Sequence, residues 1–266
     1  MVVTFYQQNI VWGDAEANRC KVEETLASLH SPALPGTSLI TDIFVVPETF
    51  TTGFGDHMAS LAEEPKGPTL QWARQMAARH DLLFVGTWIV RKGGKCFNRL
   101  HWVYPDGSYG FYDKAHTFRP SGEHDIISRG TRREVFEYKG WRIKPAVCYD
   151  LRFPKWIRNS TLNTEHLTLD YDLLLVCANW PGSRHEAWST LLKARAIENL
   201  SYVIGCNRCG VDGVGGNYTG NSALIDYKGL PVAEAEAGAD QVVTVTLDKE
   251  KLDTFRQHWP LYLDFD

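Results

Sequence analysis

Three side chains with the chemistry of acyl transfer stand at the ends of predicted strands. Cys148 follows the apolar run 141–147. A strand that ends on a nucleophile and turns sharply exposes the side chain and leaves the next backbone N–H free for an oxyanion. A cysteine nucleophile also needs a base and a charge stabiliser. Glu48 and Lys114 end two other predicted strands. Because an α/β sheet gathers its active site at strand ends, we expect all three to meet.

Each residue taken alone has a simpler interpretation. A cysteine after a strand is usually a buried residue that only packs in the core. A lysine near a turn is usually solvated, and a Pro-Glu pair after a strand often begins a turn. The three residue types in this order and in these local contexts favour the catalytic interpretation.

The segments around these residues resemble the nitrilase or carbon–nitrogen hydrolase superfamily, whose signature is a Glu-Lys-Cys triad in that chain order. The resemblance covers nearly the whole chain, through the segments 47–50, 112–116, 147–152, 179–181 and 193–199. It implies an α/β fold, a four-layer αββα sandwich with an internal pseudo-twofold. The spacing of apolar runs alone also allows a single doubly wound sheet.

Within the superfamily, three segments are most similar to the bacterial omega-amidase branch: 47–54, 148–154 and 206–208. That branch removes the terminal amide of 2-oxo acids such as 2-oxoglutaramate and 2-oxosuccinamate. The resemblance implies that Cys148 forms a thioester, Glu48 moves the protons, and Lys114 with the Tyr149 N–H stabilises the oxyanion. The same triad also serves nitriles, N-carbamoyl compounds, aliphatic amides and acyl transfer. A non-catalytic interaction protein that keeps the fold is a third hypothesis.

Further site residues come from family positions and from strand ends. Glu123, in the loop between Lys114 and Cys148, matches a second carboxylate that we expect to orient Lys114; a solvated loop glutamate is the alternative. Trp180 and Arg184 follow a strongly apolar strand. We expect Trp180 to wall the pocket and Arg184 to hold the substrate carboxylate with its planar guanidinium, against the alternative of an ordinary surface charge.

Three other residues at family positions are interpreted as ion-pair scaffolding: Arg152, Arg195 and Glu198. The motif Cys206-Asn-Arg-Cys209 has redox or zinc spacing, but it has no second ligand pair and opens no helix, so we interpret it as incidental. The nine histidines form no metal motif. No metal and no cofactor is expected.

Composition limits the class of protein. The chain has 266 residues, 44% of them hydrophobic, and a net charge of −4 with no basic patch. We expect one domain over 1–266, a small-molecule amide as the partner, and neither nucleic acid nor membrane binding. We expect a cytoplasmic protein, because the sequence shows no leader and no apolar run long enough to span a membrane. Its six cysteines are unevenly placed, which fits a reducing compartment.

Alternating apolar runs and helical patterns predict the elements. Strands are expected at 2–7, 43–46, 82–90, 98–103, 109–114, 141–147, 173–176, 202–206, 222–226 and 241–247. Helices are expected at 15–29, 69–80, 154–158, 186–199 and 249–257. Family resemblance also implies a homodimer or higher homo-oligomer, to which the apolar tail 258–263 is a plausible contributor; a cap on its own subunit is the alternative.

Overall fold

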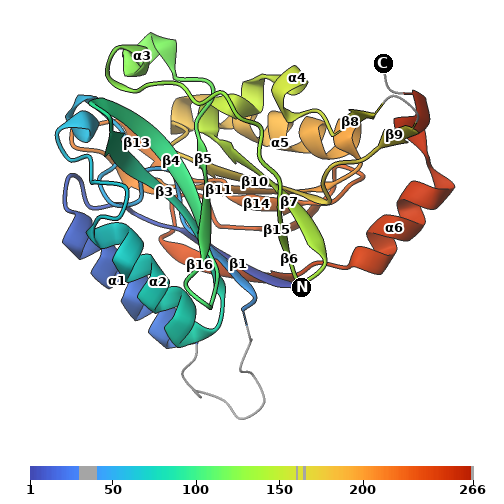
Figure 1. Ribbon diagram of the computed structural model, residues 1–266, viewed down its shortest axis with the longest axis horizontal. Coiled ribbons are helices and arrows are strands. Elements are labelled where there is room, and N and C mark those ends of the chain that lie inside the picture. Colours follow the sequence, from blue (N-terminus) through green and yellow to red (C-terminus); the bar gives the residue numbers. More distant parts are fainter. Residues whose placement is uncertain (30–40, 160, 164–165, 265–266) are drawn as a thin grey trace.

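Two six-stranded sheets form the centre of the protein (Figure 1). The computed structural model describes residues 1–29, 41–159, 161–163 and 166–264. The first sheet has the order β16-β1-β2-β3-β4-β5, and its strands are Gln241–Thr246, Val2–Gln7, Ile43–Val45, Leu83–Lys92, Lys95–Val103 and Tyr109–Asp113. The second has the order β15-β14-β11-β10-β7-β6, and its strands are Pro231–Glu234, Ala223–Ile225, Tyr202–Asn207, Leu173–Ala178, Trp141–Val147 and Phe136–Tyr138.

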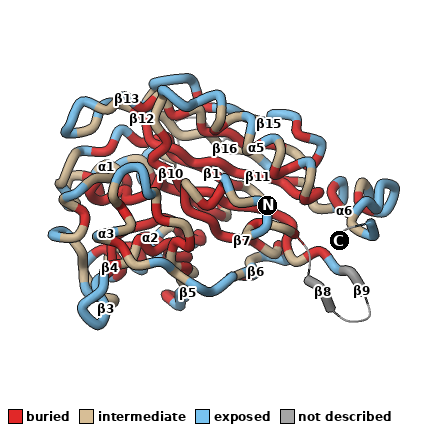
Figure 2. The backbone as a smooth tube through the Cα atoms, turned by 90° about the horizontal axis from the view of Figure 1, so that it is seen from above, coloured by how far each residue is buried: buried red, intermediate tan, exposed pale blue. Residues whose placement is uncertain are grey.

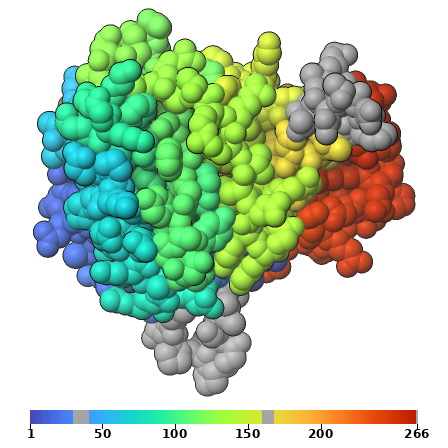
Figure 3. Space-filling model, in the orientation of Figure 1, coloured from blue at the N-terminus to red at the C-terminus, as the bar shows by residue number. Residues whose placement is uncertain are grey.

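The two sheets repeat one topology. In each, three neighbouring strands are parallel, β1-β2-β3 in one and β7-β10-β11 in the other. In each, two antiparallel strands follow the third, and one antiparallel strand borders the first. The predicted pseudo-twofold is therefore visible in strand order and direction, and the single-sheet alternative is wrong. In the space-filling view, the earlier and later parts of the chain lie side by side (Figure 3).

Helices cover the outer faces of both sheets. Helices α1 (Ala15–Leu29) and α2 (Pro68–His80) lie together against the first sheet, where Val22, Leu26 and Leu70 pack with apolar residues of its strands (Figure 1). Helix α5 (His185–Asn199) covers the second sheet. Glycine at position 205 of β11 permits this approach, because a Cβ there would lie 2.6 Å from side-chain atoms of Leu192 and Trp188.

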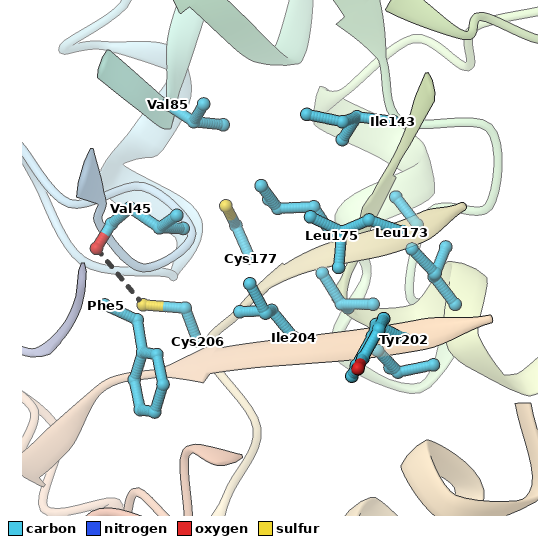
Figure 4. Close-up of a cluster of buried hydrophobic side chains, with 14 of the residues drawn as sticks. Phe5, Val45, Val85, Ile143, Leu173, Leu175, Cys177, Tyr202, Ile204 and Cys206 are labelled. Atoms are coloured by element: carbon cyan, nitrogen blue, oxygen red, sulfur yellow. Dashed lines mark hydrogen bonds between the residues drawn. The ribbon is translucent and has the colours of Figure 1, made fainter. Parts of the chain in front are cut away.

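A dry apolar layer joins the sheets. Val45 and Val85 of the first sheet belong to the same buried cluster as Ile143 and Leu175 of the second (Figure 4). Cys206 lies in this layer, where its thiol donates to the Val45 carbonyl at 3.6 Å. The buried residues run through the central strands of both sheets (Figure 2). The four layers are thus helices, sheet, sheet and helices, as predicted.

The predicted elements are found, with boundaries shifted by a few residues. The remaining helices are α3 (Glu123–Ile126), α4 (Pro154–Ile157) and α6 (Lys249–His258). The sequence did not predict several short strands: β6, β15, the pair β8 (Thr161–Asn163) and β9 (His166–Thr168), and the pair β12 (Cys209–Val211) and β13 (Asn217–Thr219). All are at most four residues long, too short for a clear alternation. Among the described residues, no helix is long and apolar enough to cross a membrane.

Candidate active site

Cys148 begins a sharp turn at the end of β7. The strand Trp141–Val147 passes directly into a 3-10 turn over Cys148–Arg152. Cys148 has φ of 46°, in the left-handed region that non-glycine residues rarely occupy. Such backbone strain persists only where the surroundings enforce it, and it concentrates at functional sites. The turn that the sequence predicts at Cys148 is present.

Lys114 lies between two buried carboxylates. Its ammonium nitrogen is 2.8 Å from Glu48 Oε1 and 3.0 and 2.9 Å from the two oxygens of Glu123. All three side chains are essentially inaccessible to solvent. Glu48 follows β2 and Lys114 follows β5, both in the first sheet. Glu123 begins the one-turn helix α3, so the loop position expected from the sequence is helical, although its predicted contact with Lys114 is present.

Asparagine side chains and backbone fix the Glu48 carboxylate. Asn98 donates to Glu48 Oε1 at 2.8 Å, and the backbone N–H of Asn179 donates to Oε2 at 2.8 Å. The Asn179 side-chain amide donates to the Glu48 backbone carbonyl, and the Asn179 backbone carbonyl accepts from the Cys148 thiol at 3.8 Å. Asn179 follows β10 of the second sheet. It therefore links the turns that carry Glu48 and Cys148.

The charges of this cluster are coupled. Burial by itself would lower the pKa of Lys114, but Glu123 and Glu48 outweigh that effect and raise it, so the ammonium stays charged. Burial raises the pKa of Glu123, with Glu48 adding to the rise and Lys114 opposing it. Burial and the nearby Glu48 carboxylate raise the pKa of the Cys148 thiol, against the pull of Lys114. The thiol thus keeps its proton until a base removes it.

A small cavity of about 180 Å³ opens onto Cys148 and Lys114. Aromatic and cationic side chains form its walls, including Phe54, Phe118, Tyr149, Trp180, Arg152, Arg184 and Tyr218. The predicted pocket residues Tyr149, Trp180 and Arg184 therefore line the same cavity as Cys148. Tyr149 packs edge-on against Phe118, with ring centroids 5.0 Å apart.

The two arginines occupy the wall in similar ways. The Arg184 guanidinium lies 5.2 Å from the centre of the Phe118 ring, and that of Arg152 lies 4.8 Å from the Trp180 ring. The scaffolding interpretation of Arg152 is wrong, because the residue lines the cavity and forms no ion pair with another described residue. Arg195 and Glu198 do pair, at 3.0 Å. Arg152 is four residues after Cys148, and the 3-10 turn between them brings it to the cavity wall.

Several site residues had no assigned role from the sequence. Asn98 lies inside β4, where nothing local marks it as polar and buried. Asn179 stands at a strand end beside the predicted Trp180, so its position was a usable signal. Tyr218 belongs to the unpredicted strand β13. The motif cysteines Cys206 and Cys209 are both free and buried, and no group of three His, Cys, Asp or Glu side chains suited to a metal occurs in the described part of the chain.

This fold and site define a class of enzyme. The family model described as carbon-nitrogen hydrolase matches residues 2–257. The chain belongs to the carbon–nitrogen hydrolase family, the nitrilase superfamily, and is an amidase-type hydrolase of that family.

Particular relatives narrow the comparison. The chain is 42% identical to "Omega-amidase YafV" of Yersinia enterocolitica, over 99% of this chain and 96% of the relative. It is 32% identical to "2-oxoglutaramate amidase" of Bacillus subtilis, over 84% of each. The crystal structure of XC1258 from Xanthomonas campestris, described as a CN-hydrolase superfamily protein with an arsenic adduct in the active site, matches with a TM-score of 0.93 and 42% identity, covering 100% of this chain and 97% of that one.

Proposed function

We propose that this protein is an omega-amidase that hydrolyses the terminal amide of 2-oxo acid amides such as 2-oxoglutaramate and 2-oxosuccinamate. One observation carries the proposal. A buried Glu48–Lys114–Glu123 cluster adjoins Cys148 at the foot of a small cavity whose wall holds two guanidinium groups. The names of the relatives at 42% and 32% identity support the same substrate class.

Each step of the reaction uses a residue of the cluster. Glu48 takes the thiol proton as Cys148 Sγ attacks the amide carbon, which forms a tetrahedral oxyanion. Lys114 and the Tyr149 N–H stabilise that oxygen. The carbon–nitrogen bond then breaks, and Glu48 protonates the departing ammonia. Water attacks the thioester, Glu48 accepts its proton and returns it to sulfur, and the 2-oxo dicarboxylic acid leaves.

The cluster of Glu48, Lys114 and Glu123 is suited to these proton transfers. A thiol whose pKa is raised by burial and by Glu48 is a poor nucleophile alone, so attack must be coupled to proton transfer. Lys114 is held charged by both carboxylates, which leaves a fixed cation where negative charge develops. Glu123 orients Lys114 by accepting from it with both oxygens.

The cavity wall supports recognition of a carboxylate. Arg184 and Arg152 each stack on an aromatic ring, which leaves their N–H groups available to a planar anion. Trp180 stands between them, holding the Arg184 carbonyl through its indole N–H at 2.9 Å. A short acid bound by a guanidinium at one end presents its distal amide to Cys148.

Substrate preference and two arginine variants test this proposal. Wild type is expected to release ammonia from 2-oxoglutaramate in preference to propionamide, glutamine or a simple nitrile, and Cys148→Ala is expected to release none. Loss of a charge-assisted hydrogen bond costs about 1.5–3 kcal/mol, so Arg184→Met or Arg152→Met should raise KM for the 2-oxo acid amide by about 10- to 100-fold. KM for propionamide should barely change.

The exposed Arg132 supplies the control, since Arg132→Met removes a guanidinium outside the cavity. Equal losses on the acidic and neutral amides would reject both arginines as anchors. A wild-type preference for nitriles or neutral amides would reject the omega-amidase assignment and leave the Cys148 chemistry intact.

We further propose that residues 1–266 form one domain, that the protein is cytoplasmic and that it is a homodimer or higher homo-oligomer. The family match over 2–257 supports the first point. Apolar side chains exposed on α5, on and just before β15, and on the C-terminal segment support self-association: Ile197, Leu230, Val232, Trp259, Leu261 and Leu263. Sedimentation equilibrium tests this, since a mass equal to one chain would contradict it.

A further inference from the structure

Asp150 is a buried carboxylate that the reaction steps above do not use. Its side chain is inaccessible to solvent and accepts four hydrogen bonds. Oδ2 accepts from the Tyr112 hydroxyl at 2.8 Å and from the Val147 backbone N–H at 3.0 Å. Oδ1 lies 2.9 Å from the His116 backbone N–H and 2.8 Å from its Nδ1. Leaving a buried carboxylate, or its buried donors, without these hydrogen bonds would be costly in free energy.

The four bonds join the two catalytic turns. Tyr112 and His116 lie two residues before and two residues after Lys114, on the chain leaving the first sheet. Val147 and Asp150 flank Cys148, on the chain leaving the second sheet. The bond to the Val147 N–H also closes the 3-10 turn in which Cys148 takes its strained φ of 46°. Asp150 therefore contacts both sides of the site without lining its cavity.

Only a carboxylate can fill this position. The Tyr112 oxygen already receives the Trp156 indole N–H at 2.9 Å and the Ala115 N–H at 3.2 Å, so its own proton points to Asp150. The backbone N–H groups of Val147 and His116 are donors by nature. An asparagine here would direct its NH₂ at the backbone N–H of either Val147 or His116, and that hydrogen bond would be lost.

We propose that Asp150 is a positioning residue that holds the Cys148 turn and the Lys114 arm at the separation the reaction requires. This proposal about Asp150 rests on the proposed function, because its turnover is measured with 2-oxoglutaramate. The reactivity of the Cys148 thiol tests it independently, because the pKa of this thiol depends on its distances to Glu48 and Lys114 and on no substrate.

Asp150→Asn and Asp172→Asn form a matched pair. Asp172 is equally buried, bonds Arg142 and Arg256, and precedes β10 at the end away from Asn179. Both variants would be made with Cys20→Ser, since Cys20 is the exposed cysteine among the six. The measurements are kcat and KM for 2-oxoglutaramate, Tm, and the pH dependence of Cys148 alkylation by iodoacetamide, read on the Cys148 peptide by mass spectrometry.

For Asp150→Asn we expect kcat to fall about 100-fold, because stabilisation of the oxyanion by Lys114 is lost. The alkylation midpoint should move away from its wild-type pH, because the pKa of Cys148 depends on its burial and on its distances to Glu48 and Lys114. Asp172→Asn should lower Tm while kcat and the midpoint stay at wild-type values. A folded Asp150→Asn protein with wild-type kcat and midpoint, or equal changes in both variants, would overturn the proposal.

Tyr112→Phe supplies a second test if Asp150→Asn does not fold. It removes one of the four bonds, and we expect about a tenfold loss in kcat and a smaller shift of the midpoint in the same direction. Tyr104→Phe is its control, because the Tyr104 hydroxyl bonds the Glu137 carbonyl outside the site. Wild-type kcat in Tyr112→Phe would reject Asp150 as a positioning residue. A wild-type enzyme inactive on the amide, with the alkylation shifts present, would reject only the proposed function.

Discussion

Two lysines of this protein are buried to a similar degree in opposite surroundings. Lys114 is 1% exposed and contacts Glu48 and Glu123, while Lys144 of β7 is 5% exposed and forms no ion pair with another described residue. The two carboxylates raise the pKa of Lys114 above its usual value despite burial. Burial, helped by the positive charge of Arg133, lowers the pKa of Lys144 to about 8.

The opposite pKa shifts of Lys114 and Lys144 show that burial by itself does not keep a lysine charged. Removing an ammonium from water disfavours its charged form, and only adjacent negative charge reverses that effect. Lys114 remains a cation next to a cavity, whereas Lys144 packs 6.0 Å from the Tyr171 ring and is destabilised when charged. A sequence that shows one lysine just after a strand and another within a strand does not distinguish these cases.

Replacing each lysine by methionine gives the largest expected contrast. Lys114→Met leaves two buried carboxylates without their cation and removes the proposed oxyanion stabiliser, so kcat should fall by about 100- to 1000-fold. Lys144→Met should keep kcat within about threefold and leave stability equal or higher, because it removes an unpaired buried charge. Ammonia release and thermal unfolding measure both. Comparable activity losses in the two variants would erase the distinction.

Glu123→Gln weakens one side of the Lys114 pairing and should have a smaller effect. The amide keeps the volume and one acceptor, and Glu48 still holds the ammonium at 2.8 Å. We expect kcat to fall by about 10- to 100-fold. Glu198→Gln, which alters the ion pair with Arg195 away from the cavity, should leave kcat unchanged. A Glu123→Gln enzyme with full activity would show that Glu48 alone suffices.

The pH dependence of stability tests the Lys144 side of the comparison. Its pKa is lowered from 10.5 to about 8 in the folded protein, so between these values the unfolded chain binds more protons. Stability should therefore rise with pH from about 8 to 10.5, by at most about 3 kcal/mol. Urea unfolding of wild type and Lys144→Met across this range isolates the effect, since only the wild type should show this part of the rise. Parallel curves would contradict the assignment.

The strand-end positions of Glu48, Lys114 and Cys148 could be predicted because they depend on local sequence. Apolar runs mark where strands stop, and the residue that follows a stop is read directly from the chain. The same rule accounts for the predicted pocket residues after β10. Edge strands such as β6 and β15 escaped prediction because three or four residues carry too little pattern.

The sequence alone determined which chemical groups follow the strands and in what order, and its family resemblance implied the four-layer fold. Tertiary structure decided which partners those groups meet. The hold of Asn98 on Glu48 depends on the order of the strands within the first sheet. The place of Arg152 in the cavity wall depends on how the two sheets pack. Hydrogen bonds and ion pairs act over about 3 Å, and residues far apart in the chain reach that separation only once the layers are assembled.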